Sequence, residues 1–221
     1  MGAKRTERDI KPEIAFSMTN NLDAYRYYSL ALEQIQMAQF TEAVALMEKA
    51  IALDPQFAMA HARIGYIYSV LQGLGEKGKP YFDKAFQFLE RLNDKEKLYV
   101  TAWAASINYD TESAIKTYKQ LIDGYPLEVE AYQRMSLLLH RQNRDEEALQ
   151  ILKQAIVFDP ESKDLHNILG IVYLYINKQA EAQAAFERYV ELAPNDPNAC
   201  DSLGNFHQFF GKYILLARAL S

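Results

Sequence analysis

The sequence predicts an all-α protein of stacked helix pairs, and two observations lead to this fold class. First, Pro126, Pro160 and Pro194 are evenly spaced, and Pro55 precedes Pro126 by two such intervals plus three positions. Second, residues of one kind recur at the same places within each interval. A fixed period of this kind is the sequence signature of a stacked repeat, in which each unit is a short supersecondary element.

Counting back from these prolines divides the chain into five repeats and a partial sixth. The second repeat carries three extra residues, and the sixth stops short of a full repeat. We therefore expect about six antiparallel helix pairs, the last incomplete with a short second helix. Residues 1–21 are expected to form a leader outside the repeats, and residues 22–221 the repeat domain. The repeats are 24–57, 58–94, 95–128, 129–162, 163–196 and 197–221.

Two positions of the repeat are small and a third is large, as closely packed antiparallel helices require. A small residue on each helix allows the two axes to approach, and a large one fills the space beside them. The eighth position holds Ala31, Gly65, Ala102, Ser136, Gly170 and Gly204. The twentieth holds Ala43, Ala114, Ala148 and Ala182, and the twenty-fourth holds Met47, Tyr118, Leu152 and Phe186.

Helix-starting and helix-ending signals agree with this division. Each repeating proline follows a helix, where its missing N–H and its ring prevent the helix from continuing. Asn93 followed by Glu96 predicts a capping pair at the start of the third repeat. Three glycines between residues 73 and 78 predict a flexible loop, with Pro80 in the first turn of the next helix. This stretch lacks the GxxxxGK[ST] spacing of a phosphate-binding loop.

These patterns resemble the tetratricopeptide repeat family over nearly the whole of residues 22–221. The resemblance is clearest in Tyr132-Gln133-Arg134-Met135-Ser136…Ala148…Leu152…Ala155…Asp159-Pro160 and His166-Asn167-Ile168-Leu169-Gly170…Ala182…Phe186…Pro194. Proteins of this family are right-handed superhelices of helix pairs, or α-solenoids, that bind partner proteins and are not themselves catalysts. The resemblance therefore implies this fold and a role in protein–protein interaction.

The composition excludes several other classes of protein. The 221 residues include 24 Lys and Arg against 29 Asp and Glu, and this net charge of −5 argues against a general nucleic-acid binder. The single cysteine excludes an internal disulfide framework. No apolar run approaches the roughly 18 residues that a membrane span needs. Because no secretory signal pattern is found, the default expectation is a cytoplasmic location.

Residues that carry chemistry are few and scattered along the chain. None of the four histidines lies three or four residues from another, and no catalytic or cofactor signature occurs. Cys200, at the fourth position of its repeat, is expected to be a buried and inert thiol. We therefore expect no enzyme activity, no catalytic residue, no metal site and no cofactor.

The resemblance also implies where a partner would bind. In this family the first helix of each repeat lines an inner, concave surface, and the inner positions here include Leu137, Ile171 and Tyr175. Near the middle of the array these positions gather aromatic and basic residues, which dominate binding energy at about 2 kcal/mol or more each when a partner buries them. Some tyrosines, among them Tyr28 and Tyr99, are expected to pack between repeats instead. The candidate partner-binding residues are Arg63, Tyr66, Tyr99, Trp103, Arg134, His140 and Arg141.

We therefore expect a non-catalytic scaffold that binds a partner peptide or helix in the concave groove. A partner with an apolar side chain and a carboxylate suits the aromatic and basic residues. A chaperone-type carboxylate clamp is disfavoured, because the matching inner positions hold neither its Lys nor its Asn.

Two alternatives stay open. One is a self-assembly module, a homo-oligomer formed through the end with Leu216 and Leu220 or through residues 22–28. The other is the sensory or docking half of a larger bacterial regulator, since residues 92–126 are loosely similar to irregular repeats fused behind bacterial signalling modules. The apolar residues at the end of the chain favour a fragment of a longer protein.

Overall fold

The computed structural model describes the backbone of residues 18–219 and the side chains of residues 18–211. These residues form α-helices joined by short turns and contain no strand, so the predicted all-α fold of helix pairs is confirmed. The chain divides into two compact units, and the boundary between Thr117 and Tyr118 lies inside helix α7 (Thr111–Gly124).

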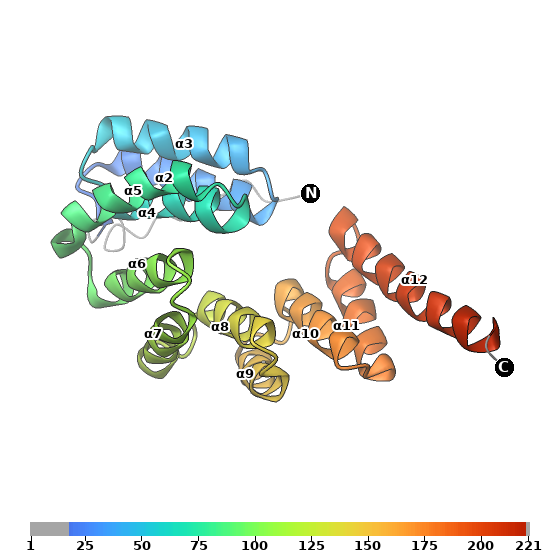
Figure 1. The fold of residues 1–221 in the computed structure, drawn as a ribbon. Coiled ribbons are helices and arrows are strands. Elements are labelled where there is room, and N and C mark those ends of the chain that lie inside the picture. The colour runs from blue at the N-terminus through green and yellow to red at the C-terminus, as the bar shows by residue number, and fades with distance from the viewer. Residues whose placement is uncertain (1–17, 220–221) are drawn as a thin grey trace. The chain divides into compact units, whose positions relative to one another are not determined.

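Unit 1 contains two helix pairs followed by α6 (Asp94–Ile107) (Figure 1). Helix α2 (Leu22–Gln36) packs on α3 (Phe40–Leu53), and α4 (Ala58–Tyr66) packs on α5 (Gly75–Gln87). The first helix of each pair also contacts the pair before it, since α4 contacts α3 and α6 contacts α4 and α5. Helix α4 continues as the π-helix η2 (Ile67–Leu71), and the 3-10 turn η3 (Leu89–Arg91) leads to α6.

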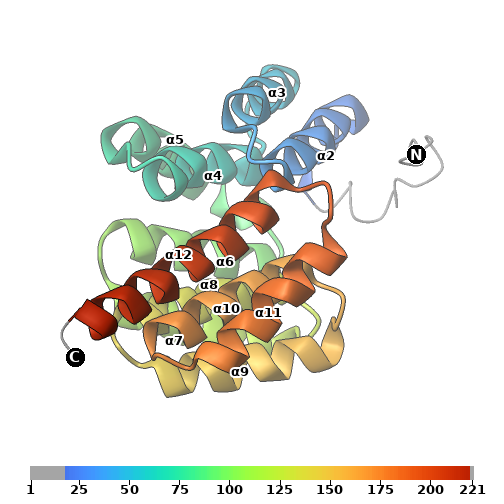
Figure 2. The same cartoon turned by 90° about the vertical axis from the view of Figure 1, so that its right-hand side faces the viewer.

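Unit 2 repeats the same arrangement (Figure 2). Helix α8 (Val129–Arg141) packs on α9 (Asp145–Phe158), and α10 (Lys163–Tyr175) packs on α11 (Gln179–Leu192). The last helix, α12 (Pro197–Ala219), contacts α11 and α10. Because α8 and α12 each contact α10, the first helices of successive repeats lie side by side within this unit.

The small residues at the eighth position allow close helix crossings, as predicted. A Cβ atom added to Gly65 would lie 2.6 Å from the ring of Phe82, and one added to Gly170 would lie 2.7 Å from the ring of Phe186. Both distances are shorter than van der Waals contact, so no side chain fits at either glycine unless the phenylalanine ring or the helix that carries it shifts. The small residues at the twentieth position, among them Ala148, are also fully buried.

The predicted capping pair at the start of α6 is confirmed. The side chain of Asn93 accepts a hydrogen bond from the backbone N–H of Glu96 at 3.0 Å, and the Glu96 carboxylate accepts one from the backbone N–H of Asn93 at 3.1 Å. These reciprocal bonds satisfy two of the donors that a helix N-terminus leaves open.

The glycine-rich segment of the second repeat differs from the expectation of a loop. Helix α5 already begins at Gly75, so Pro80 lies inside the helix rather than in its first turn. Among the three glycines only Gly73 is a turn residue, with φ at +68°. Gly78 is helical and touches the preceding helix: an added Cβ would collide with Ser69 Oγ and would lie 2.6 Å from the carbonyl oxygen of Gly65.

The sixth repeat also differs from the prediction of a short second helix. One continuous helix, α12, runs from Pro197 to Ala219. Gly211 lies within this helix and does not adopt a positive φ, so the chain does not turn back there. In the described part of the chain, one long helix therefore stands where an incomplete sixth pair was expected.

Candidate functional site

The aromatic residues predicted on the inner positions of unit 1 form a compact cluster around Trp103. The ring of Trp103 lies 5.1 Å from that of Tyr66 and 5.5 Å from that of Tyr99, measured between centroids. The guanidinium carbon of Arg63 lies 4.3 Å from the centroid of the Trp103 ring, which is a cation–π geometry. Helices α4 and α6 supply all four side chains, so the cluster connects two successive repeats.

These four residues are buried. Trp103 is fully buried, and Tyr66, Tyr99 and Arg63 expose 2%, 5% and 8% of their surface. Tyr99 and Tyr28 are thus buried, as expected of tyrosines that pack between repeats. A role of the four residues in partner binding stays a prediction, whereas their contacts with one another stabilise the packing of α4 against α6.

The remaining predicted residues lie on α8 in unit 2 and differ in their surroundings. Arg134 is half-buried, and its Nε atom lies 3.6 Å from the carboxylate of Glu130, one turn earlier. Arg141 is exposed at the end of α8 and makes no ion pair with another described residue. A partner carboxylate would compete with Glu130 for Arg134. At Arg141 it would meet no competing carboxylate among the described residues.

Asp164 adds to the electrostatic surroundings of Arg134. Desolvation raises the pKa of the Asp164 carboxyl, while the positive charges of Lys163 and Arg134 act in the opposite direction. Arg134 is therefore close to two acidic groups, Glu130 and Asp164. This balance of charge makes Arg134 a weaker site for an incoming carboxylate than Arg141.

His140 is held in a fixed orientation between two helices. Its Nδ1 atom is 2.5 Å from the carboxylate of Asp145 at the start of α9. Its ring lies 4.9 Å from the ring of Tyr175 on α10, measured between centroids. Tyr175 is 71% exposed, so this large aromatic side chain contacts the His140 ring and is otherwise open to solvent.

These residues define a surface on the first helices of unit 2, which we call the Tyr175 surface. It carries the exposed ring of Tyr175, which contacts His140, and the exposed positive charge of Arg141. Leu137 and Ile171 are half-exposed aliphatic residues that lie one helical turn before Arg141 and Tyr175, respectively. Its members are Leu137, His140, Arg141, Ile171 and Tyr175.

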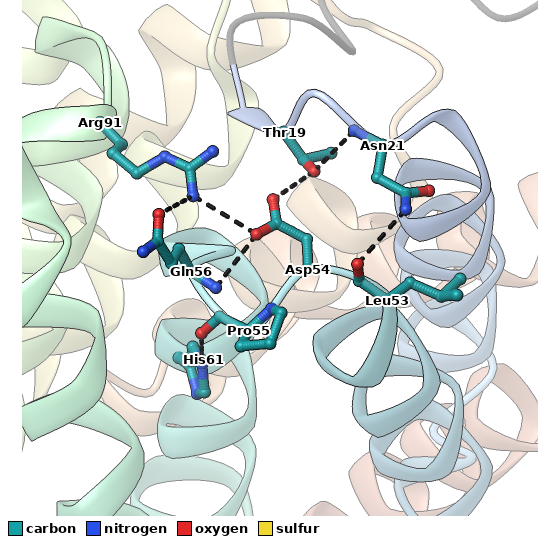
Figure 3. Close-up of polar contacts among 8 residues, drawn as sticks. All are labelled: Thr19, Asn21, Leu53, Asp54, Pro55, Gln56, His61 and Arg91. Carbon is teal, nitrogen blue, oxygen red and sulfur yellow. Dashed lines mark hydrogen bonds and ion pairs between the residues drawn. The ribbon is translucent and has the colours of Figure 1, made fainter.

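A polar network in unit 1 surrounds the turn between the first two repeats (Figure 3). The carboxylate of Asp54 accepts hydrogen bonds from Thr19 Oγ1 at 2.5 Å, from the backbone N–H of Gln56 at 3.0 Å and from Arg91 at 3.3 Å. Arg91 also donates to the side chain of Gln56 at 3.1 Å. The Asp54 carboxylate thus joins the segment before α2, the end of α3 and the end of the second repeat, which is a structural role.

His61 and His166 have equivalent roles in successive units. His61 Nε2 lies 3.0 Å from the carbonyl oxygen of Pro55, and His166 Nε2 lies 3.0 Å from that of Pro160. Each histidine therefore fastens the turn before its own helix. Burial lowers the pKa of His61 below its ordinary value of 6.5, and this effect exceeds that of its hydrogen bond to Pro55.

A depression between α2 and α3 is a further hollow on unit 1. Its lining combines apolar and charged residues, and the ammonium of Lys49 lies 5.7 Å from the centroid of the Tyr27 ring. The repeat pattern does not mark this depression as a binding site, because most of its residues do not occupy inner positions. The depression is lined by Asp23, Arg26, Tyr27, Leu30, Lys49, Ala52 and Leu53.

The expectation of a buried Cys200 is wrong. Its side chain is exposed, because no second helix among the described residues covers this face of α12. Within the described part of the chain no cluster of three or more His, Cys, Asp or Glu side chains is placed to hold a metal ion. None of the helices searched there is long and apolar enough to cross a membrane.

Comparison with known sequences shows the class to which this chain belongs. Profiles of the tetratricopeptide repeat match residues 24–57, 100–163 and 164–196, which together are more than half of the chain. The chain belongs to the tetratricopeptide repeat family. Members of this family generally mediate protein–protein interaction and are typically non-catalytic scaffolds.

Individual relatives are distant. Protein FlbA of Caulobacter vibrioides is 25% identical over 181 residues, which cover 80% of this chain. The chain spans only 29% of the length of that relative.

Solved structures support the fold. The tetratricopeptide repeat protein TTC0263 of Thermus thermophilus superposes with a TM-score of 0.68 at 17% identity, covering 83% of this chain and 98% of that one. A tetratricopeptide repeat protein of Parabacteroides merdae superposes with a TM-score of 0.54 at 16% identity, covering 90% of this chain and 77% of that one.

Proposed function

We propose that this chain is a non-catalytic scaffold that binds a partner peptide or helix on the Tyr175 surface. An apolar side chain of the partner packs on Tyr175 and on the aliphatic residues Leu137 and Ile171. A partner carboxylate pairs with Arg141.

The observation that carries this proposal is the exposed ring of Tyr175 supported by His140. An exposed aromatic side chain normally loses side-chain entropy when a partner orders it. Here the ring contacts the ring of His140, whose Nδ1 lies 2.5 Å from Asp145, and this contact lowers that cost by favouring one orientation of Tyr175 before binding. A preorganised tyrosine beside an exposed arginine has the composition of a binding hot spot.

Paired substitutions test this surface against a matched control in the same unit. The test protein carries Arg141→Glu and Tyr175→Ala, and the control carries Lys153→Glu and Val157→Ala on exposed positions of α9. Each protein is used to recover partners from a lysate of the source organism, and the bound proteins are measured by mass spectrometry. Loss of about 2 kcal/mol at a hot spot weakens binding by about 30-fold.

We expect a partner that the wild type and the control recover equally and that the test protein loses. Equal recovery by all three proteins would reject the Tyr175 surface. If the wild type recovers only itself, self-assembly becomes the better account, and light scattering at several concentrations would then reveal a dimer or larger oligomer.

A further inference from the structure

The depression between α2 and α3 in unit 1 has the size of a ligand site. Its volume is about 580 Å³, and pockets that bind ligands typically have volumes of about 300–1,000 Å³. One face of each helix forms it, since the lining residues recur at helical spacing along α2 and along α3. The depression is therefore built by regular elements of the first repeat.

The apolar part of this lining is left open by the described residues. Leu30 is 43% exposed and Leu53 is 44% exposed. Leu30 occupies the seventh position of its repeat, and the equivalent residues of the second and fourth repeats, Ile64 and Met135, are buried. The first repeat thus offers to a ligand an apolar position that other repeats use for packing.

The depression also carries an excess of positive charge. The ammonium of Lys49 lies 5.7 Å from the centroid of the Tyr27 ring, and Lys49 makes no ion pair with another described residue. The guanidinium of Arg26 lies 4.0 Å from the carboxylate of Asp23. Two cations, Arg26 and Lys49, therefore face one carboxylate in the lining. This balance suits a ligand with a single negative charge.

The positive charge and the apolar surface are close together. Lys49 precedes Leu53 by four residues on α3, which is the spacing of neighbouring side chains on one helix face. The start of α2 lies beside the end of α3, where Asn21 Nδ2 donates a hydrogen bond to the carbonyl oxygen of Leu53 at 3.3 Å (Figure 3). Asp23 is therefore at the Leu53 end of the depression, and Lys49 is one turn away, beside Tyr27.

We propose that this depression binds the C-terminus of a partner protein whose last residues are apolar. The terminal carboxylate pairs with Lys49, and the last side chain packs on Leu30 and Leu53. A C-terminal residue carries a carboxylate and a side chain on one carbon atom, so it reaches both parts of the lining at once. Asp23 disfavours phosphate groups and other ligands with more than one negative charge. This inference is independent of the Tyr175 surface, which lies in unit 2.

A short peptide with a free C-terminus tests this site. The peptide Gly-Ser-Gly-Ser-Leu-Leu is titrated to about 10 mM into the isotopically labelled full chain, and the backbone amide shifts of α2 and α3 are followed by NMR. We expect saturable binding with a Kd of about 1 mM or lower. The amidated peptide lacks the terminal charge and should bind at least about tenfold more weakly. Equal binding of acid and amide, or no shift with the acid, overturns the proposal.

Charge substitutions test the role of Lys49. Lys49→Glu should weaken binding of the free peptide at least about tenfold, while Lys79→Glu, at an exposed lysine of α5 in the same unit, should change it by less than about twofold. Asp23→Asn should strengthen binding about twofold or more, because it removes a like charge. An unchanged affinity with Lys49→Glu overturns the proposal, and so does weaker binding with Asp23→Asn.

Two further titrations identify the occupant. Octanoate has a carboxylate and an apolar chain but no peptide groups, and it should bind at least about fivefold more weakly than the peptide, whose second leucine fills more of the depression. Equal affinity would make a small apolar acid the ligand and would reject a protein C-terminus. Dilution of the protein without peptide should leave the amide shifts of α2 and α3 unchanged. Shifts that follow protein concentration would show that a second copy covers the depression, and the proposal would be wrong.

Discussion

Trp103 is the side chain whose removal should disturb unit 1 most. It is fully buried and contacts Arg63, Tyr66 and Tyr99 from two successive repeats. We expect Trp103→Ala to lower the free energy of unfolding by about 3–5 kcal/mol, because it leaves a cavity and removes the ring on which the Arg63 cation rests. Urea unfolding followed by circular dichroism measures this change, since the variant has no tryptophan fluorescence.

Val157→Ala provides the control for this measurement. Val157 is 78% exposed, so its truncation should change the free energy of unfolding by less than about 0.5 kcal/mol. If Trp103→Ala lowered the free energy of unfolding as little as Val157→Ala does, the described packing around Trp103 would be contradicted. The burial of Trp103 also means that its substitution is a test of stability, and that binding is better tested at Tyr175 and Arg141.

His61 should make the free energy of unfolding decrease as the pH falls. Its pKa is lowered in the folded protein by burial, so the unfolded chain binds a proton more readily. Its second ring nitrogen, Nδ1, is buried and has no hydrogen-bond partner among the described residues, so a second N–H would be unsatisfied there. The stabilisation from neutral His61 is complete above the unfolded pKa of about 6.5 and is lost as pH falls from there toward the lower folded pKa.

We expect His61→Gln to reduce the loss of unfolding free energy between pH 7 and pH 5, as measured by urea unfolding at several pH values. His166→Gln is the matched control, since His166 makes the same hydrogen bond at Pro160 but is only half-buried. An identical pH dependence in the wild type and in His61→Gln would show that the buried ring does not control this transition.

At the scale of the helix, the close crossing of α4 and α5 depends on Gly78 but not on Gly75. Gly78 touches the preceding helix so closely that an added Cβ would lie 2.6 Å from a backbone oxygen, whereas nothing lies within 4 Å of a Cβ at Gly75. Gly78→Ala should therefore destabilise the protein by about 1–3 kcal/mol through overpacking. Gly75→Ala should be neutral or stabilising by up to about 1 kcal/mol, since alanine favours a helix.

Thermal unfolding of the two variants decides this point, because they add the same methyl group to the same helix. Stabilisation by Gly78→Ala would mean that α5 lies farther from α4 than described. Equal destabilisation by both would point to a helix start other than Gly75.

Some elements could be predicted from the sequence because their signals are local. The Asn93–Glu96 capping pair depends on residues three apart, and the small eighth position depends on one crossing within one repeat. The start of α5 was missed, because glycine usually weakens a helix and here is retained for the close contact at Gly78. The exposure of Cys200 was missed for a related reason: the pattern of α12 predicts a second helix that the described structure does not form.

At the scale of the whole molecule, a residue's position within the repeat does not predict whether its side chain is buried or exposed. The inner-position rule of the family selects Trp103 and Tyr175 equally, but only the packing of neighbouring helices decides that one is buried and the other 71% exposed. The role of Asp145 could not be foreseen either, since it reaches His140 from the start of the following helix. Charge counts alone also do not separate Arg134, beside Glu130, from Arg141.

The measurement that tests the central claim most directly is cross-linking within cells. A photoreactive phenylalanine analogue replaces Tyr175 in one protein and Val157 in another, so that both reactive groups are exposed on unit 2 but on different helices. We predict a covalent adduct with one partner protein at position 175, reduced by Arg141→Glu, and no such adduct at position 157. An adduct of equal yield at both positions, or none at position 175, would contradict a scaffold that binds its partner on the Tyr175 surface.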